Sequence, residues 1–293
     1  MGWVPQVDVN FRFLMNQVRR FIIISIFLLI LFCSAGRLDS WLETHFISVG
    51  HGDAVFFRFP NGNNMLIDSG NLFQGKVVAD YLGSLGVKRI HHFIITHPHP
   101  DHLGGFFRIS SRFGIENVYD NGQLSDDEIY SEFKKFTMQS GQTVRTLNIN
   151  DRIVEGEVSL QILHPDSGNL LSGLNNNSVV IRLKYGSFLA LFTGDLLIEG
   201  QKLLIKKYGN NLDSDLLKAP HHASNASNWK GFFEIVSPEV SIVTVGPNRY
   251  GYPSIETLEN LKTNSGKVYR TDRKGTIVIK VFPDKRMDIV TQK

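Results

Sequence analysis

Short apolar runs alternate with amphipathic segments along most of the chain, and turns rich in glycine and asparagine separate them. The short runs are typical of strands, and a spacing of three to four residues between apolar positions is typical of helices. This alternation predicts one α/β domain over residues 37–293. Strands are expected at 44–49, 53–59, 64–69, 89–96, 158–165, 178–186, 187–195, 267–272 and 275–282, and helices at 76–86, 126–136 and 253–266.

The N-terminal segment has a different pattern. Arg19 and Arg20 directly precede an apolar run over Phe21–Phe32, and small residues follow it. These features predict a secretory signal peptide, with cleavage after Ala35. The run is shorter than a full membrane span of about 20 residues, but a slightly longer segment could serve as a membrane anchor. A buried helix is the alternative.

Residues 1–36 are therefore expected to be a signal peptide or a membrane anchor. The positive-inside rule then places residues 37–293 outside the cytoplasm, attached to the membrane if the segment is not cleaved. The formal net charge of +3 comes without a long Lys/Arg block, so charge alone does not indicate nucleic acid. The single cysteine, Cys33, excludes an intramolecular disulfide.

The clearest chemical signal is a cluster of ligand-type side chains after the strand expected at 89–96. The segment "ITHPHPDHLGG" carries His97, His99, Asp101 and His102. Neutral imidazoles and carboxylates are good ligands for zinc and similar divalent metals. These groups could supply two adjacent metal sites. A solvated loop with chance histidines is the alternative, but further candidates downstream argue against it.

Two later strand ends carry those candidates. Asp195 follows the apolar run of "LALFTGD", where its carboxylate could bridge two cations or cap the following helix. His221 and His222 follow another short strand in "LLKAPHHAS". Adjacent side chains on an extended backbone point in opposite directions. We therefore expect one of the two histidines to bind metal and the other to donate a proton or hold substrate.

Taken in this order, the motifs resemble those of the metallo-β-lactamase superfamily. Within that superfamily, the chain resembles over nearly all of 44–281 the extracytoplasmic hydrolase domain of the competence DNA-uptake channel proteins (the ComEC/Rec2 family). "VGHGDAVFFRF", "NNNSVVIRLKYG" and "NRYGYPSIETLENL" match blocks of that family in order. The resemblance implies an α/β fold of four layers, an αββα sandwich. It also implies one or two divalent metal ions, zinc or manganese, at one edge between the two sheets.

The resemblance further implies a mechanism. A divalent metal lowers the pKa of bound water from about 15.7 to roughly 7. Asp101 would hold the attacking water, and His221 or His222 would protonate the leaving group. The metal ligands implied are His97, His99, Asp101, His102, Asp195, and His221 or His222.

The chain departs from the family pattern at two places. His51 stands where the family usually has glutamine, and it could touch substrate or serve as a structural hydrogen-bonding residue. The usual third histidine of the metal site has no clear counterpart. Asn177 could fill that position, and His164 is a second candidate. The alternative for His164 is a strand-end histidine bonded to the backbone.

Four other residues are candidates for supporting roles. Asp53 and Asp68 could orient a ligating histidine, or they could simply form turns. Arg249 and Tyr250, with nearby Arg270 and Arg273, could hold a phosphate and stack a base, or they could belong to an ordinary surface turn.

The expected function is a metal-dependent hydrolase, a phosphodiesterase or nuclease acting on single-stranded DNA or on a polymer of the cell envelope. The alternatives are a phosphorylcholine-type esterase of the envelope, a β-lactam or thioester hydrolase, and a non-catalytic binding module tethered to the membrane. The sequence predicts no oligomeric state.

Overall fold

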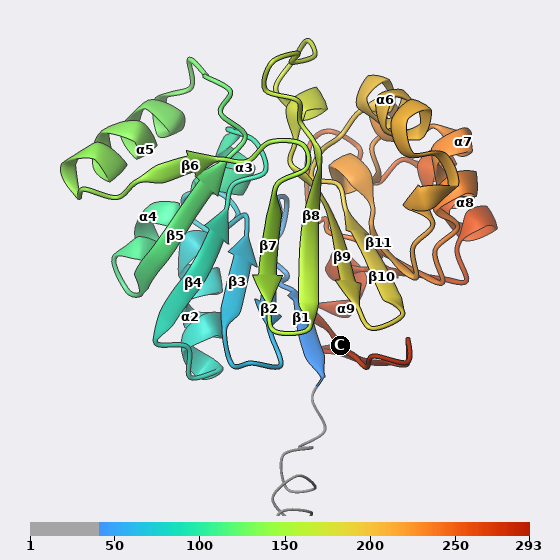
Figure 1. Cartoon of the computed structure of the whole chain (residues 1–293), viewed down its shortest axis with the longest axis horizontal. Coiled ribbons are helices and arrows are strands. Elements are labelled where there is room, and N and C mark those ends of the chain that lie inside the picture. The colour runs from blue at the N-terminus through green and yellow to red at the C-terminus, as the bar shows by residue number, and fades with distance from the viewer. Residues whose placement is uncertain (1–40) are drawn as a thin grey trace, which may run out of the picture. The chain divides into compact units, whose positions relative to one another are not determined.

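Two β-sheets packed face to face form the centre of the molecule (Figure 1). The computed structural model describes residues 41–293. The first sheet contains, in spatial order, β15 (Met287–Thr291), β14 (Ile277–Val281), β1 (Leu42–Phe46), β2 (Val55–Arg58), β3 (Asn64–Ile67), β4 (Arg89–Ile94), β5 (Gly114–Asp120) and β6 (Val144–Thr146). The second contains β13 (Lys267–Arg270), β12 (Val240–Val243), β11 (Leu216–Lys218), β10 (Phe188–Phe192), β9 (Val180–Tyr185), β8 (Val158–His164) and β7 (Arg152–Glu155).

Helices cover the outer face of each sheet. Three helices pack their apolar residues on the first sheet, and three others pack theirs on the second. The predicted four-layer αββα sandwich is therefore confirmed. The helices are α2 (Gly75–Ser84), α4 (Phe106–Ser110) and α5 (Glu128–Gln139) on the first sheet, and α6 (Ile198–Tyr208), α7 (Lys230–Val236) and α8 (Ile255–Asn264) on the second.

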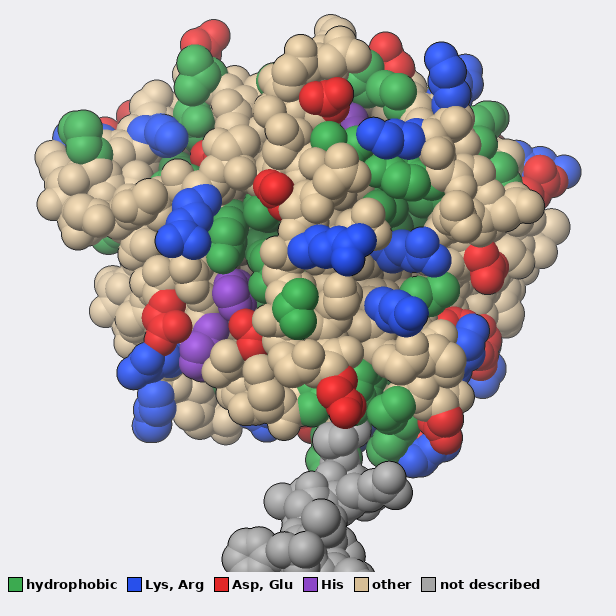
Figure 2. Space-filling model, in the orientation of Figure 1, with side chains coloured by type: hydrophobic (Ala, Val, Ile, Leu, Met, Phe, Trp, Pro, Cys, Tyr) green, Lys and Arg blue, Asp and Glu red, His purple; other side chains and the backbone are tan. Residues whose placement is uncertain are grey.

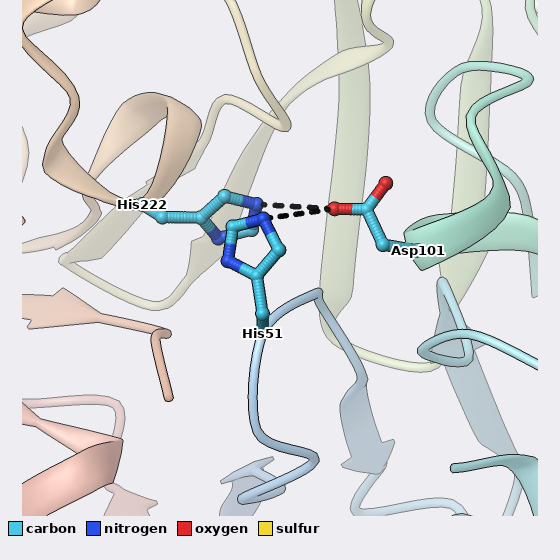
Figure 3. A group of neighbouring side chains, drawn as sticks. All are labelled: His51, Asp101 and His222. Carbon is cyan, nitrogen blue, oxygen red and sulfur yellow. Dashed lines mark ion pairs between the residues drawn. The ribbon is translucent and has the colours of Figure 1, made fainter. Parts of the chain in front are cut away.

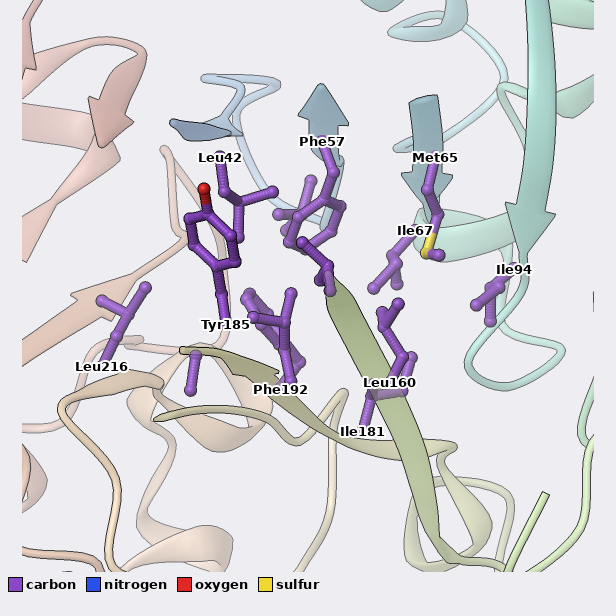
Figure 4. Packing of buried hydrophobic residues seen from close by; sticks show 14 of the residues in the cluster. Leu42, Phe57, Met65, Ile67, Ile94, Leu160, Ile181, Tyr185, Phe192 and Leu216 are labelled. Carbon is purple, nitrogen blue, oxygen red and sulfur yellow. The ribbon is translucent and has the colours of Figure 1, made fainter. Parts of the chain in front are cut away.

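The main hydrophobic core lies between the sheets (Figure 4). Phe57 from the first sheet meets Phe192 from the second edge-to-face, with ring centroids 5.0 Å apart. The central strands have apolar neighbours on both faces, one from the opposite sheet and one from the helices, and this explains their nearly continuous apolar sequences. In β3, for example, Met65 and Ile67 belong to the core between the sheets, whereas Leu66 packs on the helical side.

Strand direction determines where functional residues can gather. The strands β1, β3 and β4 run in the same direction, because β2 is antiparallel to both β1 and β3, and β4 is parallel to β3. In the second sheet β10, β11 and β12 are parallel. In open α/β sheets, ligands bind beyond the carboxyl ends of parallel strands. The loops that follow these six strands carry the predicted site residues except His164, which lies in β8, and Asn177, which lies between β8 and β9.

Each strand and helix named in the sequence analysis has a counterpart in the structure, but several elements were not predicted. β5, β6, β7 and β15 mix exposed and buried positions, so their apolar runs are weak. The strand expected at 267–272 ends at Arg270, because a short helix, α9 (Thr271–Lys274), begins there.

The segment predicted as a signal peptide or membrane anchor, residues 1–36, lies outside the described residues. Residues 41–293 form one compact unit. Among the helices of that unit, none is long and apolar enough to cross a membrane.

Candidate metal centre

The loops after the six strands bring the predicted ligands together at one edge of the sandwich. Asp195 lies at the middle of the group. Its Oδ2 is 3.2 Å from His102 Nε2 and 3.4 Å from His222 Nε2. The Oδ2 of Asp101 is 3.9 and 3.7 Å from the same two nitrogens. Ligand atoms around one tetrahedral ion lie about 3.3–3.5 Å apart when the bonds are about 2.0–2.2 Å long. These four side chains therefore match a site for one divalent ion.

Neighbouring groups fix how the two histidines present their nitrogens. The Nδ1 of His102 donates to Asp68 Oδ2 at 2.8 Å, and the Nδ1 of His222 donates to the Thr244 carbonyl at 2.8 Å. In each ring a proton is thus held on Nδ1, and Nε2, which faces Asp195, is the nitrogen that could bind a metal once its own proton is displaced. Such a hydrogen bond to the far nitrogen is a regular feature of metal-binding histidines.

Asp68 is itself held in place by Thr96. The Thr96 amide donates to Asp68 Oδ1 at 2.8 Å, and the Thr96 hydroxyl donates to Asp68 Oδ2 at 2.7 Å. Asp68 is fully buried. From the sequence, Asp68 could orient a ligating histidine or simply form a turn, and its hydrogen bond to His102 supports the first role.

A second group of ligands lies on the other side of Asp195. Ligand atoms of His97, His102 and Asp195 lie within 4.8 Å of one another. The Nε2 of His97 is 2.9 Å from the Nδ1 of His99. His97 Nδ1 has the hydroxyls of Thr96 at 3.1 Å and Ser178 at 3.4 Å. This position has fewer ligands than the first, and the usual third histidine is not supplied.

An unpaired buried atom indicates that the group is suited to a metal. His222 Nε2 is buried and without a hydrogen-bond partner among the described residues. Buried polar atoms normally have a partner, and leaving one unpaired costs about 1–3 kcal/mol. His222 Nε2 faces the carboxylates of Asp101 and Asp195, so an ion at this point would satisfy it. The donor set of imidazole nitrogens and carboxylate oxygens suits zinc or manganese.

The electrostatics also favour a cation. Burial lowers the pKa of His102 and His222, but the Asp195 carboxylate beside both outweighs it. The pKa of His102 is raised well above its usual value, and that of His222 is raised to about 10. Without metal, both rings are therefore protonated on both nitrogens and positively charged at neutral pH. Burial, with His102 next to it, holds the pKa of His97 well below its usual value, so that ring is neutral.

A buried lysine that the sequence analysis did not identify supports the centre from behind. The ammonium group of Lys218 contacts the Asp53 carboxylate, donates to the Gly194 carbonyl at 2.9 Å and lies 3.7 Å from Asp195 Oδ1. Burial lowers the pKa of Lys218, but Asp53 and Asp195 raise it overall, so the group stays charged. Asp53 also accepts from the Thr244 hydroxyl. It is therefore part of the support of the site.

The expectation that one of His221 and His222 binds metal while the other donates a proton or holds substrate was based on an extended backbone, and that premise is wrong. Both residues are left-handed, with φ of 48° and 52°. The two rings consequently lie on the same side, and both approach Asp195 Oδ2, His221 Nε2 at 3.8 Å and His222 Nε2 at 3.4 Å. His222 belongs to the groups of potential ligands, whereas His221 faces the neighbouring cavity.

Neither candidate for the third histidine position lies among the ligands. The side chain of Asn177 is used within its own loop, where it bonds the amide of Leu171 and the carbonyls of Leu171 and Gly173. His164 donates from Nε2 to the Asn176 carbonyl at 2.7 Å, which is the backbone-bonded role considered as its alternative. Asn175, two residues before Asn177, faces the site instead.

Asn175 makes this contact through its amide nitrogen, which lies 3.3 Å from His221 Nε2. Its amide oxygen is buried and unpaired among the described residues. The segment "NNNS" was recognised as the correct region, but sequence alone could not show which asparagine a short 3-10 turn (Asn175–Asn177) would turn toward the metals.

The centre opens into a cavity of about 270 Å³ with an aromatic wall. Tyr250 stacks on Tyr252 with ring centroids 5.5 Å apart, and its ring lies 5.2 Å from that of His51. The guanidinium of Arg249 lies over the Tyr250 ring at 5.4 Å. Arg270 and Arg273 do not join this wall; they line a separate cavity beside α8.

A divalent ion at such a centre activates a water molecule as nucleophile at neutral pH and stabilises negative charge on the group attacked. The chain's own residues do the rest. Asp101 could orient an attacking water, and His221, which lines the cavity, could hydrogen-bond a leaving group. The centre is therefore equipped for hydrolysis.

The fold and the candidate site together indicate a metal-dependent hydrolase, and comparison with known proteins identifies its superfamily. The profile described as "Metallo-beta-lactamase superfamily" matches residues 47–246. The chain belongs to this superfamily, whose members use divalent metals, usually one or two, and the His/Asp groups described above could hold them.

Three curated relatives are similar over most of the chain. ComE operon protein 3 of Bacillus subtilis is 27% identical over 82% of this chain and 33% of its own length. Competence protein ComA of Neisseria gonorrhoeae is 28% identical, with coverage of 78% and 30%. Recombination protein 2 of Haemophilus influenzae is 26% identical, with coverage of 90% and 32%. The chain thus spans about a third of the length of these relatives, and the resemblance to competence proteins is confirmed.

Solved structures agree on the fold. YhfI from Bacillus subtilis, a metallo-β-lactamase fold protein, superposes with a TM-score of 0.53 at 13% identity, covering 82% of this chain and 99% of its own. CmlA, a diiron β-hydroxylase from Streptomyces venezuelae, gives 0.52 at 15% identity, with coverage of 82% and 54%.

Metal binding should release protons and strengthen as the pH rises. His102 and His222 carry protons at pH 7 in the absence of metal, and an ion can bind only by displacing them. Below the pKa of about 10 for His222, each unit of pH should raise the affinity by up to about tenfold per displaced proton. Calorimetry at pH 7 in two buffers of different ionisation enthalpy counts the protons. A Zn²⁺ affinity that is constant from pH 6 to 9 would contradict this charge assignment.

Replacing Lys218 should destabilise the fold strongly. Lys218→Met leaves the buried Asp53 carboxylate without its cation, which typically costs about 3–5 kcal/mol. Urea unfolding of the metal-free protein measures the change, and Lys184→Met, at an exposed position of β9, is the matched control. Adding Asp53→Asn to Lys218→Met should recover part of the loss. A cost of under about 1 kcal/mol would show that the pair does not support the site.

Proposed function

We propose that the protein is a metal-dependent phosphodiesterase that cleaves nucleic acid, with single-stranded DNA as the leading substrate. The observation that carries this proposal is the aromatic wall beside the metal centre. Tyr250 and Tyr252 offer stacked faces on which a base can lie, and Arg249 is placed to pair with a phosphate. A phosphodiester between them would reach Asp101 and Asp195 within the same cavity.

A basic surface on the second sheet supports a polyanionic substrate. Lys and Arg side chains gather over β8–β10 (Figure 2). The strand register aligns Arg152, Gln161 and Arg182 in one row across β7, β8 and β9, with Lys184 two residues further along β9. These side chains line a surface groove of about 760 Å³. Cationic contacts with phosphates supply most of the sequence-independent affinity for nucleic acid.

The names of the relatives point the same way. One relative is named a competence protein, one a recombination protein and one a protein of the ComE operon. Nucleic acid is the polymer on which competence and recombination act. Because this chain spans only about a third of each relative, we transfer the class of substrate and not the whole process. Manganese and zinc are the proposed metals, since the ligands are mixed carboxylate and imidazole.

A phosphorylcholine-type esterase of the cell envelope is the second candidate. The faces of Tyr250 and Tyr252 could hold a quaternary ammonium group as well as a base. A β-lactam or thioester hydrolase has no comparable support, because neither substrate uses the basic groove. A non-catalytic binding module would not require the ligands that His102, His222 and Asp101 provide around Asp195.

The test is hydrolysis by the full chain after chelation, with Mn²⁺ or Zn²⁺ added back. The substrates are bis-p-nitrophenyl phosphate, p-nitrophenyl phosphorylcholine, single-stranded DNA and nitrocefin. We expect metal-dependent cleavage of DNA and of bis-p-nitrophenyl phosphate. In His97→Ala with Asp101→Ala, cleavage should fall to the rate of the metal-free protein, because both metal positions lose a ligand. His92→Ala with Asp126→Ala, outside the centre, is the matched control and should keep full activity.

Other results would redirect the proposal. Turnover of nitrocefin alone would favour a lactamase, and turnover of the phosphorylcholine ester alone would favour the envelope esterase. No turnover of any substrate, with metal bound at stoichiometric level, would favour a binding module. Full activity in the double variant would exclude the metal mechanism.

We also propose that the hydrolase unit works outside the cytoplasm, exported or anchored by residues 1–36. The support is the sequence pattern of Arg19 and Arg20 before an apolar run. Alkaline phosphatase fused after Lys293 is a suitable reporter, because its disulfides form only in an oxidising compartment. The fusion should be active, and a fusion lacking residues 1–36 should not be. Equal activity of the two fusions would overturn the assignment.

A further inference from the structure

The ring of His51 lies against the metal centre but makes no hydrogen bond to the described residues. Its Nδ1 is buried and without a partner. Its Nε2 faces Asp101 Oδ2 at 3.5 Å, a distance that gives an ion pair and no short hydrogen bond. In Figure 3 the ring lies beside that of His222, and both rings point toward the Asp101 carboxylate. The structural hydrogen-bonding role considered from the sequence is therefore not found.

Histidines outside the centre behave differently. His45 bonds the Tyr81 hydroxyl at 2.8 Å, His92 bonds Glu155 at 2.6 Å, and His164 bonds the Asn176 carbonyl. Each of these rings has a protein group that explains its position. Apart from the Asp101 carboxylate at 3.5 Å, His51 has ring contacts, with centroids 4.6 Å from His222 and 5.2 Å from Tyr250.

The loop that carries His51 is fastened to the segment that carries Asp101. The Asp53 amide donates to the Asp101 carbonyl at 3.3 Å. Gly52, at φ +124°, is so close to that carbonyl that a Cβ would overlap its oxygen. On the other side, a Cβ at Gly246 would overlap the backbone of Gly50. The loop is thus clamped from two sides, and the His51 ring is held against the ligands of the first metal position.

The spacing around His51 matches a shared ion. The same Asp101 oxygen lies 3.5 Å from His51 Nε2 and 3.7 Å from His222 Nε2. The ligand atoms of these three residues lie within 4.8 Å of one another. Ligands of one divalent ion with bonds of about 2.0–2.2 Å lie about 3.3–3.5 Å apart, and the two separations from the Asp101 oxygen are close to this.

We propose that His51 is a further ligand of the divalent ion bound by Asp101 and His222. This adds an imidazole nitrogen to a position that already has His102 and Asp195. Imidazole suits zinc, whereas carboxylate and water oxygens suit manganese. His51 therefore shifts the preference of this position toward zinc. The inference rests on the metal centre and is independent of which polymer the enzyme cleaves.

The test compares the full chain with its His51→Gln variant, since glutamine keeps a long polar side chain but removes the ring. Zn²⁺ affinity, measured by competition with a chromophoric chelator, should fall at least about tenfold, and Mn²⁺ affinity should change less. X-ray absorption of the zinc-loaded protein should show one imidazole fewer per centre. His92→Gln, which removes a ring bonded to Glu155, is the matched control and should leave both quantities unchanged.

A second variant keeps the test open if glutamine disturbs the loop. His51→Gly creates space for a free imidazole, and imidazole in solution should restore the Zn²⁺ affinity. The melting temperature of each metal-free variant shows whether the fold is intact. Unchanged Zn²⁺ affinity and an unchanged imidazole count in His51→Gln would overturn the proposal. Since no substrate is present, a failure here is distinguishable from a failure of the proposed phosphodiesterase activity.

Discussion

The ammonium group of Lys218 lies between the carboxylates of Asp53 and Asp195, and the geometry of the metal centre depends on it. Three buried aspartates, counting Asp68, would repel one another without a counter-charge, and burying an unpaired carboxylate is costly. Lys218 neutralises part of this charge from the side that faces away from the cavity. The Oδ1 of Asp195 is turned toward the lysine, which leaves Oδ2 free to face the histidines. One buried cation thus sets the direction of the shared ligand.

The topology explains why so many polar groups can meet in a largely apolar fold. The loops after β1, β3 and β4 in one sheet and after β10, β11 and β12 in the other all open at the same edge. Each strand is anchored in a hydrophobic core, so the position at which its chain leaves the sheet is fixed. The loops then need only a few residues to bring their side chains into contact. The site is therefore rigid where it is anchored by strands, and open only on the side of Tyr250 and Tyr252.

Much of this could be predicted from the sequence, for identifiable reasons. The ligands His97, His99, Asp101 and His102 follow one strand within a short motif, so local spacing alone indicates a metal site. The strong apolar runs of the central strands predicted an α/β domain, and the four-layer sandwich was implied by the family resemblance of the motifs. Edge strands such as β15 were missed because their apolar positions are half exposed.

Contacts between distant segments were harder to foresee. Lys218 stands inside the apolar strand "LLK", and a charge in such a run was a usable signal of a buried ion pair. Its partner, Asp53, lies far away in sequence and only the fold brings the two together. The left-handed backbone at His221 and His222 left no trace in the residue types, since histidine rarely adopts it. The choice of Asn175 over Asn177 depends on a single short turn.

The two halves of the centre are supported by different chemistry, and this makes them unequal. His102 and His222 are anchored through Nδ1 by a carboxylate and a carbonyl, which are strong acceptors that fix the tautomer. The Nδ1 of His97 is anchored only by hydroxyls, which can donate as well as accept and so do not fix its tautomer. The half with fixed tautomers also has the larger number of ligands. Strain at the left-handed His222 is tolerated there because the surrounding hydrogen bonds determine its ring position. The buried hydrogen bonds therefore fix the ligands of one metal position. The second position is linked to the first through Asp195, which both share.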